Sequence, residues 1–412
     1  MEIYDFDKKI NRLGTKSYKW DLMGEEYIPL WVADTDFEVP PAVTKRLTDR
    51  INHGLYGYLL TGNEVYDAIT GWFDRICSVK IPGKSWIKLV PGIVPALAVC
   101  SNYVPKTLGK GCKDNEDCKK RCEVLGDKVY KPLACTPNYS MLLEAPDTAG
   151  NKMLRVPLKN DDEDYSIDFE ALQAAVTEDT HVFYLCNPHN PVGRVYSFEE
   201  LKKVSEFAKK NNLIVVSDEV HCEVVFEGKH IPFFAVDDYA REHSICLYSN
   251  GKLCNLADLI LSFAVIPNDE LRAEFERLGY AFGEEHILNV EAGTASFAEC
   301  DEWKKQLLEY LKGNRDYLES ELKRRFPKVR MPHLQSTYLQ WADFRGYGEE
   351  ITAKFFMDNA KVFVSDGADF DGPGYVRINF ATQREVLSKA LDRMERALNE
   401  YISKRREKNA DR

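Results

Sequence analysis

HVFYLC (181–186), SFEELKKVSEFAKKNN (197–212) and LIVVSD (213–218) are the stretches of sequence that decide the fold class. The first and third are short apolar runs bounded by polar or turn residues, which is typical of buried strands. In the second, Ser197 and Glu200 have the spacing of a capping box, and apolar residues recur at helical intervals. This strand–helix–strand order predicts an α/β protein with a mostly parallel sheet and helices on both faces.

The sequence on either side extends this pattern and then changes it. Two further strands are predicted at 244–249 and 259–266, whereas the chain after about residue 285 reads as a smaller α+β segment. The elements predicted there are a long amphipathic helix at 301–326, strands at 336–344 and 375–381, and a helix from about Gln383 to Tyr401. We therefore expect an N-terminal arm (1–45) that contributes to the small domain, a large domain (46–285) and a C-terminal small domain (286–412).

Composition excludes several classes of protein. The chain has 412 residues, with 55 Lys and Arg against 66 Asp and Glu, so its net charge of -11 argues against nucleic-acid binding. No apolar run approaches the roughly 18 residues that span a membrane, and the charged N-terminus does not resemble a secretory signal. The 11 cysteines then favour free thiols in a reducing compartment, and we expect a cytoplasmic protein.

A polar stretch at 108–124 interrupts the alternation of strands and helices. It contains Cys112, Cys118 and Cys122, and Cys135 follows downstream. Because no pair of cysteines has the C-x2-C spacing of structural zinc sites, we expect a loop insertion with incidental cysteines and no metal.

Four motifs place polar side chains at or inside predicted strands: NPHNPVGR (187–194), SDEVH (217–221), SNGKLCNL (249–256) and GYVRINFA (374–381). Active residues of mostly parallel sheets lie at the carboxyl ends of strands. Each motif also has a structural interpretation: a turn, a helix N-cap, a solvated lysine and a structural ion pair, respectively.

Taken together and in this order, the motifs resemble the fold-type I pyridoxal-phosphate enzymes of the aspartate aminotransferase superfamily. The resemblance is closest to the cystathionine β-lyases and cysteine-S-conjugate β-lyases related to MalY and PatB. It extends over essentially the whole chain except the insertion, and further segments that support it are NRLGTKSYKWD (11–21), WVADTDFEVPPAV (31–43), GLYGY (54–58), PGIVPAL (91–97) and STYLQW (336–341). It implies a three-layer aspartate-aminotransferase-like fold and the cofactor pyridoxal 5'-phosphate.

The resemblance also assigns roles to residues around that cofactor. Lys252 would hold it covalently, Asp218 would keep its pyridine nitrogen protonated, and Asn190 and His221 would donate hydrogen bonds to its 3'-oxygen. The remaining assignments are Gly92, Ile93, Val94 and Ser249 for the phosphate and Tyr139 for the face of the ring.

Substrate recognition and assembly follow from the same resemblance. Arg377 would bind the carboxylate of a small amino-acid substrate through its planar guanidinium group. Tyr58, with Tyr56 as the reserve, would reach the cofactor phosphate of a neighbouring subunit, which implies a homodimer. Lys252 would then remove the Cα proton, and a thiolate would leave to give pyruvate and ammonia.

Two departures from the subgroup lie near the lysine. Gly251 replaces a serine and so removes a hydroxyl from the expected phosphate site, and Asp258 adds a carboxylate that would repel the phosphate if it faced it. The alternatives to a lyase are an aminotransferase and a homologue that has lost catalysis and serves as a regulator. The presence of Lys252, Asp218 and Arg377 together argues against the regulator.

Overall fold

The computed structural model describes residues 3–103, 129–283 and 285–410, so Cys112, Cys118 and Cys122 of the insertion lie outside the described residues. The strands in the described ranges are β1 (Ile28–Leu30), β2 (Ile87–Val90), β3 (Leu133–Thr136), β4 (Leu154–Pro157), β5 (Lys159–Asp161), β6 (Asp164–Ser166), β7 (Val182–Cys186), β8 (Ile214–Asp218), β9 (Ser244–Ser249), β10 (Ser262–Val265), β11 (Leu339–Asp343), β12 (Val362–Asp366) and β13 (Tyr375–Asn379). The α-helices are α1 (Tyr18–Asp21), α2 (Pro41–His53), α3 (Glu64–Trp72), α4 (Ile93–Cys100), α6 (Ser140–Glu144), α7 (Phe169–Ala175), α8 (Phe198–Lys210), α9 (Asp238–Glu242), α10 (Asp269–Leu278), α11 (Ile287–Ala298), α12 (Asp301–Arg325), α13 (Ala353–Ala360) and α14 (Arg384–Ala410).

The larger sheet has the strand order β2-β10-β9-β8-β7-β3-β4. Strands β4, β3, β7, β8 and β9 run parallel, whereas β10 is antiparallel to both of its neighbours. Because β10 is antiparallel to both β9 and β2, β2 runs in the same direction as β9. The prediction of a mostly parallel sheet is therefore confirmed.

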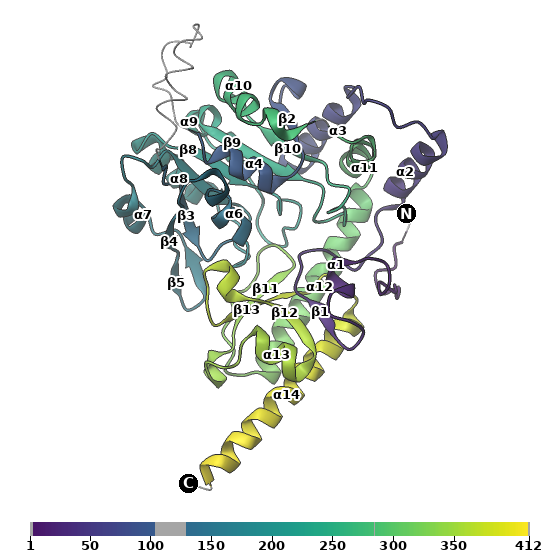
Figure 1. Cartoon of the computed structure of the whole chain (residues 1–412), viewed down its shortest axis with the longest axis vertical. Coiled ribbons are helices and arrows are strands. Elements are labelled where there is room, and N and C mark those ends of the chain that lie inside the picture. The colour runs from purple at the N-terminus through teal and green to yellow at the C-terminus, as the bar shows by residue number, and fades with distance from the viewer. Residues whose placement is uncertain (1–2, 104–128, 284, 411–412) are drawn as a thin grey trace.

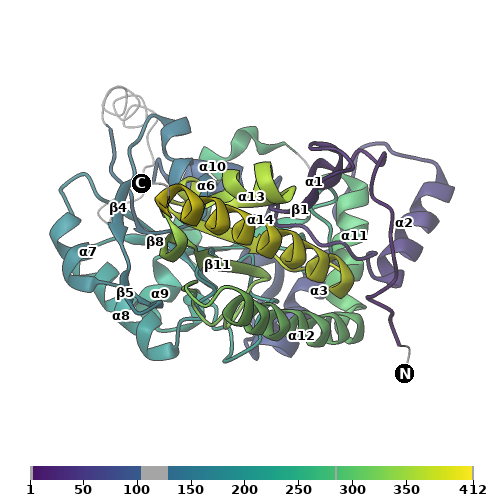
Figure 2. The same ribbon diagram turned by 90° about the horizontal axis from the view of Figure 1, so that it is seen from below.

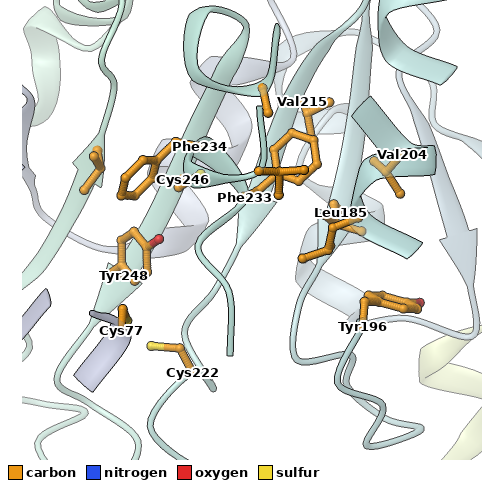
Figure 3. Packing of buried hydrophobic residues seen from close by; sticks show 14 of the residues in the cluster. Cys77, Leu185, Tyr196, Val204, Val215, Cys222, Phe233, Phe234, Cys246 and Tyr248 are labelled. Atoms are coloured by element: carbon orange, nitrogen blue, oxygen red, sulfur yellow. The ribbon is translucent and has the colours of Figure 1, made fainter. Parts of the chain in front are cut away.

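Helices cover both faces of this sheet, which gives the three layers (Figure 1). Along β8, Val215 belongs to one apolar cluster and Ile214 and Val216 belong to another, because successive side chains of a strand point to opposite faces. Helices α3 and α8 contribute to the first cluster, and α4, α6 and α10 contribute to the second. Figure 3 shows part of the first cluster, where Phe233 and Phe234 lie near Cys246 and Tyr248 of β9.

Helix α8 begins at the predicted capping box. The Ser197 side chain accepts a hydrogen bond from the backbone N–H of Glu200, whose own side chain accepts one from the N–H of Ser197. Leu201, Val204 and Phe207 then point into the core, as their spacing predicts. Such reciprocal capping satisfies two donors that would otherwise have no partner at the helix start.

The smaller sheet has the order β1-β12-β13-β11, so a strand from the N-terminal arm pairs with strands from the C-terminal part of the chain. Helices α12 and α14 contact each other and pack with α13 on this sheet (Figure 2). The domain boundaries themselves stay a prediction.

Helix α14 is longer than predicted, because it continues past Tyr401 to Ala410. Figure 1 shows its last turns projecting away from the rest of the molecule. Residues 403–407 are exposed, and the hydropathy of an exposed helix end does not distinguish it from a coil.

Candidate active site

The carboxyl ends of five strands bring most of the predicted site residues to one edge of the larger sheet. Because β2, β3, β7, β8 and β9 run in the same direction, the residues that follow them meet there. These residues are Gly92, Ile93 and Val94 after β2, Tyr139 after β3, Asn190 after β7, Asp218 and His221 at and after β8, and Ser249 and Lys252 at and after β9.

Lys252 is partly buried, and its Nζ donates a hydrogen bond to the carbonyl oxygen of Ala33 at 3.2 Å. Burial, followed by the neighbouring charge of Arg377, lowers the pKa of Lys252 to about 8, although Asp218 and Asp34 act in the opposite direction. A lysine with a lowered pKa is deprotonated more readily, and the neutral amine is the form that acts as a nucleophile or a base.

Asp218 is the last residue of β8, and only 2% of its surface is exposed. Its carboxylate accepts a hydrogen bond from the backbone N–H of Val220 at 3.2 Å. Burial raises the pKa of Asp218 to about 6. A buried carboxylate that accepts so few hydrogen bonds requires a cation to stabilise its charge.

His221 lies beside these groups and is buried as well. Burial lowers its pKa well below the usual value, with further lowering by Lys252 and Arg377, so the imidazole is neutral. In the part of the chain that the structure describes, its Nδ1 has no hydrogen-bond partner. The same holds for Nδ2 of Asn187, whose backbone N–H bonds to the carbonyl of Asp218. Both atoms are therefore available to a bound group.

Arg377 reaches the site from β13 of the smaller sheet. Its guanidinium nitrogens donate to Asn190 Oδ1 at 3.2 Å, to the carbonyl of Trp31 at 3.1 Å and to Ser365 Oγ at 3.2 Å. The ring centroid of Phe370 lies 4.3 Å from the guanidinium carbon. Burial lowers the pKa of Arg377 to about 10.

None of the carboxylates in the described ranges forms an ion pair with Arg377, which is only 6% exposed. A buried guanidinium without a counter-ion is costly unless an anion joins it. This observation favours a ligand carboxylate over the alternative of a structural ion pair.

The predicted phosphate end consists of Gly92, Ile93, Val94 and Ser249. Gly92 is the N-cap residue of α4 and offers no side-chain cap, so the first N–H groups of the helix point outward. The Ser249 hydroxyl accepts a hydrogen bond from the N–H of Gly251 at 2.9 Å.

The two departures from the subgroup have different structural consequences. A Cβ atom at Gly251 would lie 3.1 Å from Ser249 Oγ and 3.3 Å from Ile260 Cδ1, so a serine there would have to displace its neighbours. Asp258 is exposed to solvent. Its charge is therefore screened by water.

The aromatic residues predicted for the site differ in their placement. Tyr139 is partly buried. Burial raises the pKa of Tyr139, and the charge of Asp218 raises it further, so Tyr139 interacts electrostatically with that site residue. Tyr58 is fully exposed and Tyr56 is 53% exposed, with its hydroxyl donating to the carbonyl of Ile51. A single chain therefore does not bring Tyr58 or Tyr56 to the other site residues.

Residue chemistry alone missed the arm segment 31–34, which lies against both cations of the site. The carbonyls of Trp31 and Ala33 accept the hydrogen bonds from Arg377 and Lys252 that are described above, and Tyr338 also donates to Ala33 at 3.0 Å. In the sequence, only the family resemblance indicates this segment. Its contacts are made by the backbone, which leaves no signature in side-chain chemistry.

In the described ranges, no group of three or more His, Cys, Asp or Glu side chains is arranged to hold a metal ion. Nor is any helix of those ranges long and apolar enough to cross a membrane.

Comparison with known proteins places this arrangement in a family. The family model for aminotransferase class I and II matches residues 110–394. The cystathionine β-lyase PatB of Bacillus subtilis is 32% identical over 411 residues, which cover 96% of this chain and 100% of that protein.

Solved structures give the same result over nearly the full length. A pyridoxal 5'-phosphate-bound C–S lyase from Staphylococcus hominis has a TM-score of 0.86 and 30% identity, covering 96% of this chain and 98% of its own. Cystalysin from Treponema denticola, which contains pyridoxal 5'-phosphate, has a TM-score of 0.87 and 27% identity, covering 97% and 100%. The chain belongs to the aminotransferase class I and II family.

Proposed function

We propose that the protein is a pyridoxal 5'-phosphate-dependent carbon–sulfur β-lyase that cleaves L-cystathionine or another cysteine S-conjugate to a thiol, pyruvate and ammonia. The observation that supports it most directly is the meeting of Lys252, Asp218 and Arg377 at one edge of the sheet, with no carboxylate paired to the arginine in the described chain. Relatives of similar length that are named as cystathionine β-lyase or C–S lyase support the choice of reaction.

The side chains at this edge fit pyridoxal 5'-phosphate. The cofactor's aldehyde requires an amine, and the pKa of Lys252 is lowered. Its protonated pyridine nitrogen requires a buried carboxylate, and Asp218 forms no ion pair with any residue that the structure describes. The unbonded Nδ1 of His221 and Nδ2 of Asn187 can donate to polar atoms of such a ring. When bound, the cofactor supplies an electron-withdrawing ring that makes the Cα proton of an amino acid acidic.

The protein side chains orient the substrate and move its protons. Arg377 binds the α-carboxylate with two parallel hydrogen bonds, and Asn190 supports it from the larger sheet. Lys252 Nζ accepts the Cα proton. The Cβ–S bond then breaks with its electron pair on sulfur, and the remaining three-carbon fragment takes up water to give pyruvate and ammonium.

An aminotransferase is the second candidate, because the matching family model is named for that activity. Both reactions use the same first proton transfer, so the products distinguish them. We expect purified protein to form pyruvate and a free thiol from L-cystathionine without an added keto acid. A requirement for 2-oxoglutarate with formation of glutamate would establish the aminotransferase, and no turnover of either kind would support the regulatory homologue.

The proposal includes a homodimer in which Tyr58 reaches the neighbouring site. Tyr58 is fully exposed, and Leu55 and Leu60 of the same segment are 66% and 92% exposed, which is unusual for apolar residues that stay in water. Mixing a Lys252→Ala subunit with a Tyr58→Phe subunit should restore one intact site in each heterodimer. A fully active monomer in sedimentation would exclude the shared site.

We also propose that residues 46–285 form the cofactor domain and that residues 1–45 and 286–412 together form the smaller domain. The protein as a whole is proposed to be cytoplasmic. The pairing of β1 with β12 supports the grouping of the N-terminal arm with the C-terminal part of the chain. The eight described cysteines that have free, buried thiols agree with a reducing compartment.

A further inference from the structure

The hairpin of β5 and β6 carries a glutamate in a backbone conformation that glutamate rarely adopts. Asp162 and Glu163 form its two-residue turn and have φ values of 53° and 69°. Turns with two positive φ angles favour Asn followed by Gly, because Cβ atoms are disfavoured there. Glu163 is nonetheless only 7% exposed. A buried carboxylate in a strained turn indicates that the side chain has a purpose beyond closing the hairpin.

The Glu163 carboxylate connects the hairpin to the smaller sheet. Its Oε2 accepts a hydrogen bond from the hydroxyl of Tyr165 at 3.2 Å, and its Oε1 accepts one from the hydroxyl of Tyr375 at 3.1 Å. Asn160 Nδ2 donates to both hydroxyls, at 3.1 and 3.4 Å. We call these four residues the Glu163 clasp. Tyr375 alone among them belongs to β13, so the clasp joins the smaller sheet to the β5–β6 hairpin, which is a two-stranded sheet of its own that follows β4 in the chain.

Burial raises the pKa of both tyrosines, and the charge of Glu163 contributes in each case. The hydroxyls therefore remain protonated and keep donating to the carboxylate. Arg330 lies 3.8 Å from Glu163 and is 56% exposed, so it compensates the buried charge only weakly. The hydroxyl donors are consequently the main stabilising partners of the carboxylate among the described residues.

A continuous row of packed side chains leads from the clasp to Arg377. Tyr375 and Arg377 are two residues apart on β13 and so point to the same face, and Trp341 lies directly opposite Arg377 on β11. The Trp341 ring stacks on Tyr375 with centroids 4.9 Å apart and an interplanar angle of 5°. Phe370 packs edge-on against Trp341 at 5.9 Å and lies under the guanidinium group of Arg377.

We propose that Glu163 and Tyr375 are positioning residues for substrate binding: the clasp holds β13 against the β5–β6 hairpin so that Arg377 meets the α-carboxylate with both hydrogen bonds. This inference rests on the proposed role of Arg377. A two-point hydrogen bond tolerates little displacement, and no carboxylate in the described chain holds the guanidinium in place. The clasp supplies that constraint at the first residue of the same strand, two positions before Arg377.

The test compares two probes that differ only in the carboxylate. L-Alanine has the amine and the α-carboxylate but no leaving group, and ethylamine has the amine alone. Dissociation constants are measured on the cofactor-loaded full-length protein from the absorbance of the bound cofactor. Tyr375→Phe should weaken L-alanine binding roughly three- to tenfold, a change on the scale of a typical hydrogen-bond contribution, and should leave ethylamine binding unchanged. Glu163→Gln keeps the size and one acceptor oxygen and should weaken L-alanine in the same direction.

Tyr239→Phe is the matched control. Like Tyr375→Phe, it removes a hydroxyl with two hydrogen bonds, here to the carbonyls of Ala208 and Leu213 at 3.2 and 3.0 Å. Tyr239 lies on α9, which is beside the larger sheet and away from β13 (Figure 1). The substitution should change neither dissociation constant. A selective loss in both clasp variants, absent from the control, would support the proposal.

Two results would overturn the clasp proposal: unchanged L-alanine binding in Tyr375→Phe and Glu163→Gln, or equal weakening of both probes, which would indicate general loosening. If Tyr375→Phe does not fold, Glu163→Gln decides alone. Arg377→Lys separates this failure from that of the proposed function. If Arg377→Lys itself leaves L-alanine binding unchanged, the carboxylate role of Arg377 is wrong.

Discussion

Asp218 and Glu219 are adjacent buried carboxylates with opposite surroundings. Glu219 accepts four hydrogen bonds within the described chain, from Ser217 Oγ, the N–H of Phe233, His230 Nε2 and the Tyr248 hydroxyl. Asp218 accepts one there, from the N–H of Val220. The Glu219 side of β8 is thus a completed polar network, whereas the Asp218 side is incomplete without a bound group.

The difference separates two reasons for burying a charge. A carboxylate whose partners all belong to the protein stabilises the fold once the network has formed. A carboxylate with few partners costs stability and is retained where a ligand completes it. Neutralising each residue in turn should therefore affect different properties of the molecule.

Asp218→Asn should produce the largest change, and it should be a change in activity. The amide has the same size but cannot hold a proton on a pyridine nitrogen, so turnover of L-cystathionine should fall by about 100-fold or more. The fold should persist, because only one hydrogen bond to Asp218 is affected. Steady-state kinetics with circular dichroism as the folding control measure this. Turnover near that of the wild type would remove Asp218 from the site.

Glu219→Gln should instead reduce stability. The neutral amide cannot accept all four hydrogen bonds, so the free energy of unfolding should fall by about 2–4 kcal/mol. Turnover per folded molecule should stay within about threefold of the wild type, since Glu219 faces the core rather than the site. Urea unfolding measures the first value. A stability within about 0.5 kcal/mol of the wild type would show that the network is dispensable.

The pH dependence of stability sharpens the contrast further. The pKa of Asp218 is raised to about 6 in the folded protein, above the value of about 4 in an unfolded chain, so the folded state binds the proton more tightly. Its contribution to stability is fully present below about pH 4 and is lost as the pH rises through 6. Cofactor-free Asp218→Asn should thus match the wild type at pH 4.

The same variant should exceed the wild type at pH 8 by on the order of 2–3 kcal/mol, because it lacks the buried charge. Unfolding by urea at the two pH values measures the difference. If the free energies of unfolding of variant and wild type differed by the same amount at both pH values, Asp218 would be ionised at no cost in the folded protein.

Local sequence patterns predicted the elements of the fold well. The strands 182–186, 214–218 and 244–249 and the helices α8 and α12 lie where apolar runs, a capping box and helical spacing indicated. Such signals are local, because burial on one face repeats within a few residues. The true end of α14 was missed, since the last residues are exposed and polar.

The candidate site was predicted in part. Strand ends indicated Asp218 and Lys252, because parallel strands converge at one edge. The Glu219 network and the carbonyls of Trp31 and Ala33 were not predicted. The hydrogen bond from Arg377 to Trp31 joins residues 346 positions apart, and Glu219 meets Tyr248 across 29 positions. Contacts over such separations depend on the assembled fold, which periodicity does not describe.

The most direct measurement is the covalent attachment of the cofactor. Borohydride reduction of the loaded protein, followed by peptide mass mapping, should place pyridoxal on Lys252. Glu219→Gln should be labelled at the same residue, because its network lies outside the site. A label on another lysine, or fully loaded protein with none, would contradict the claim that the incomplete side of β8 is the cofactor site.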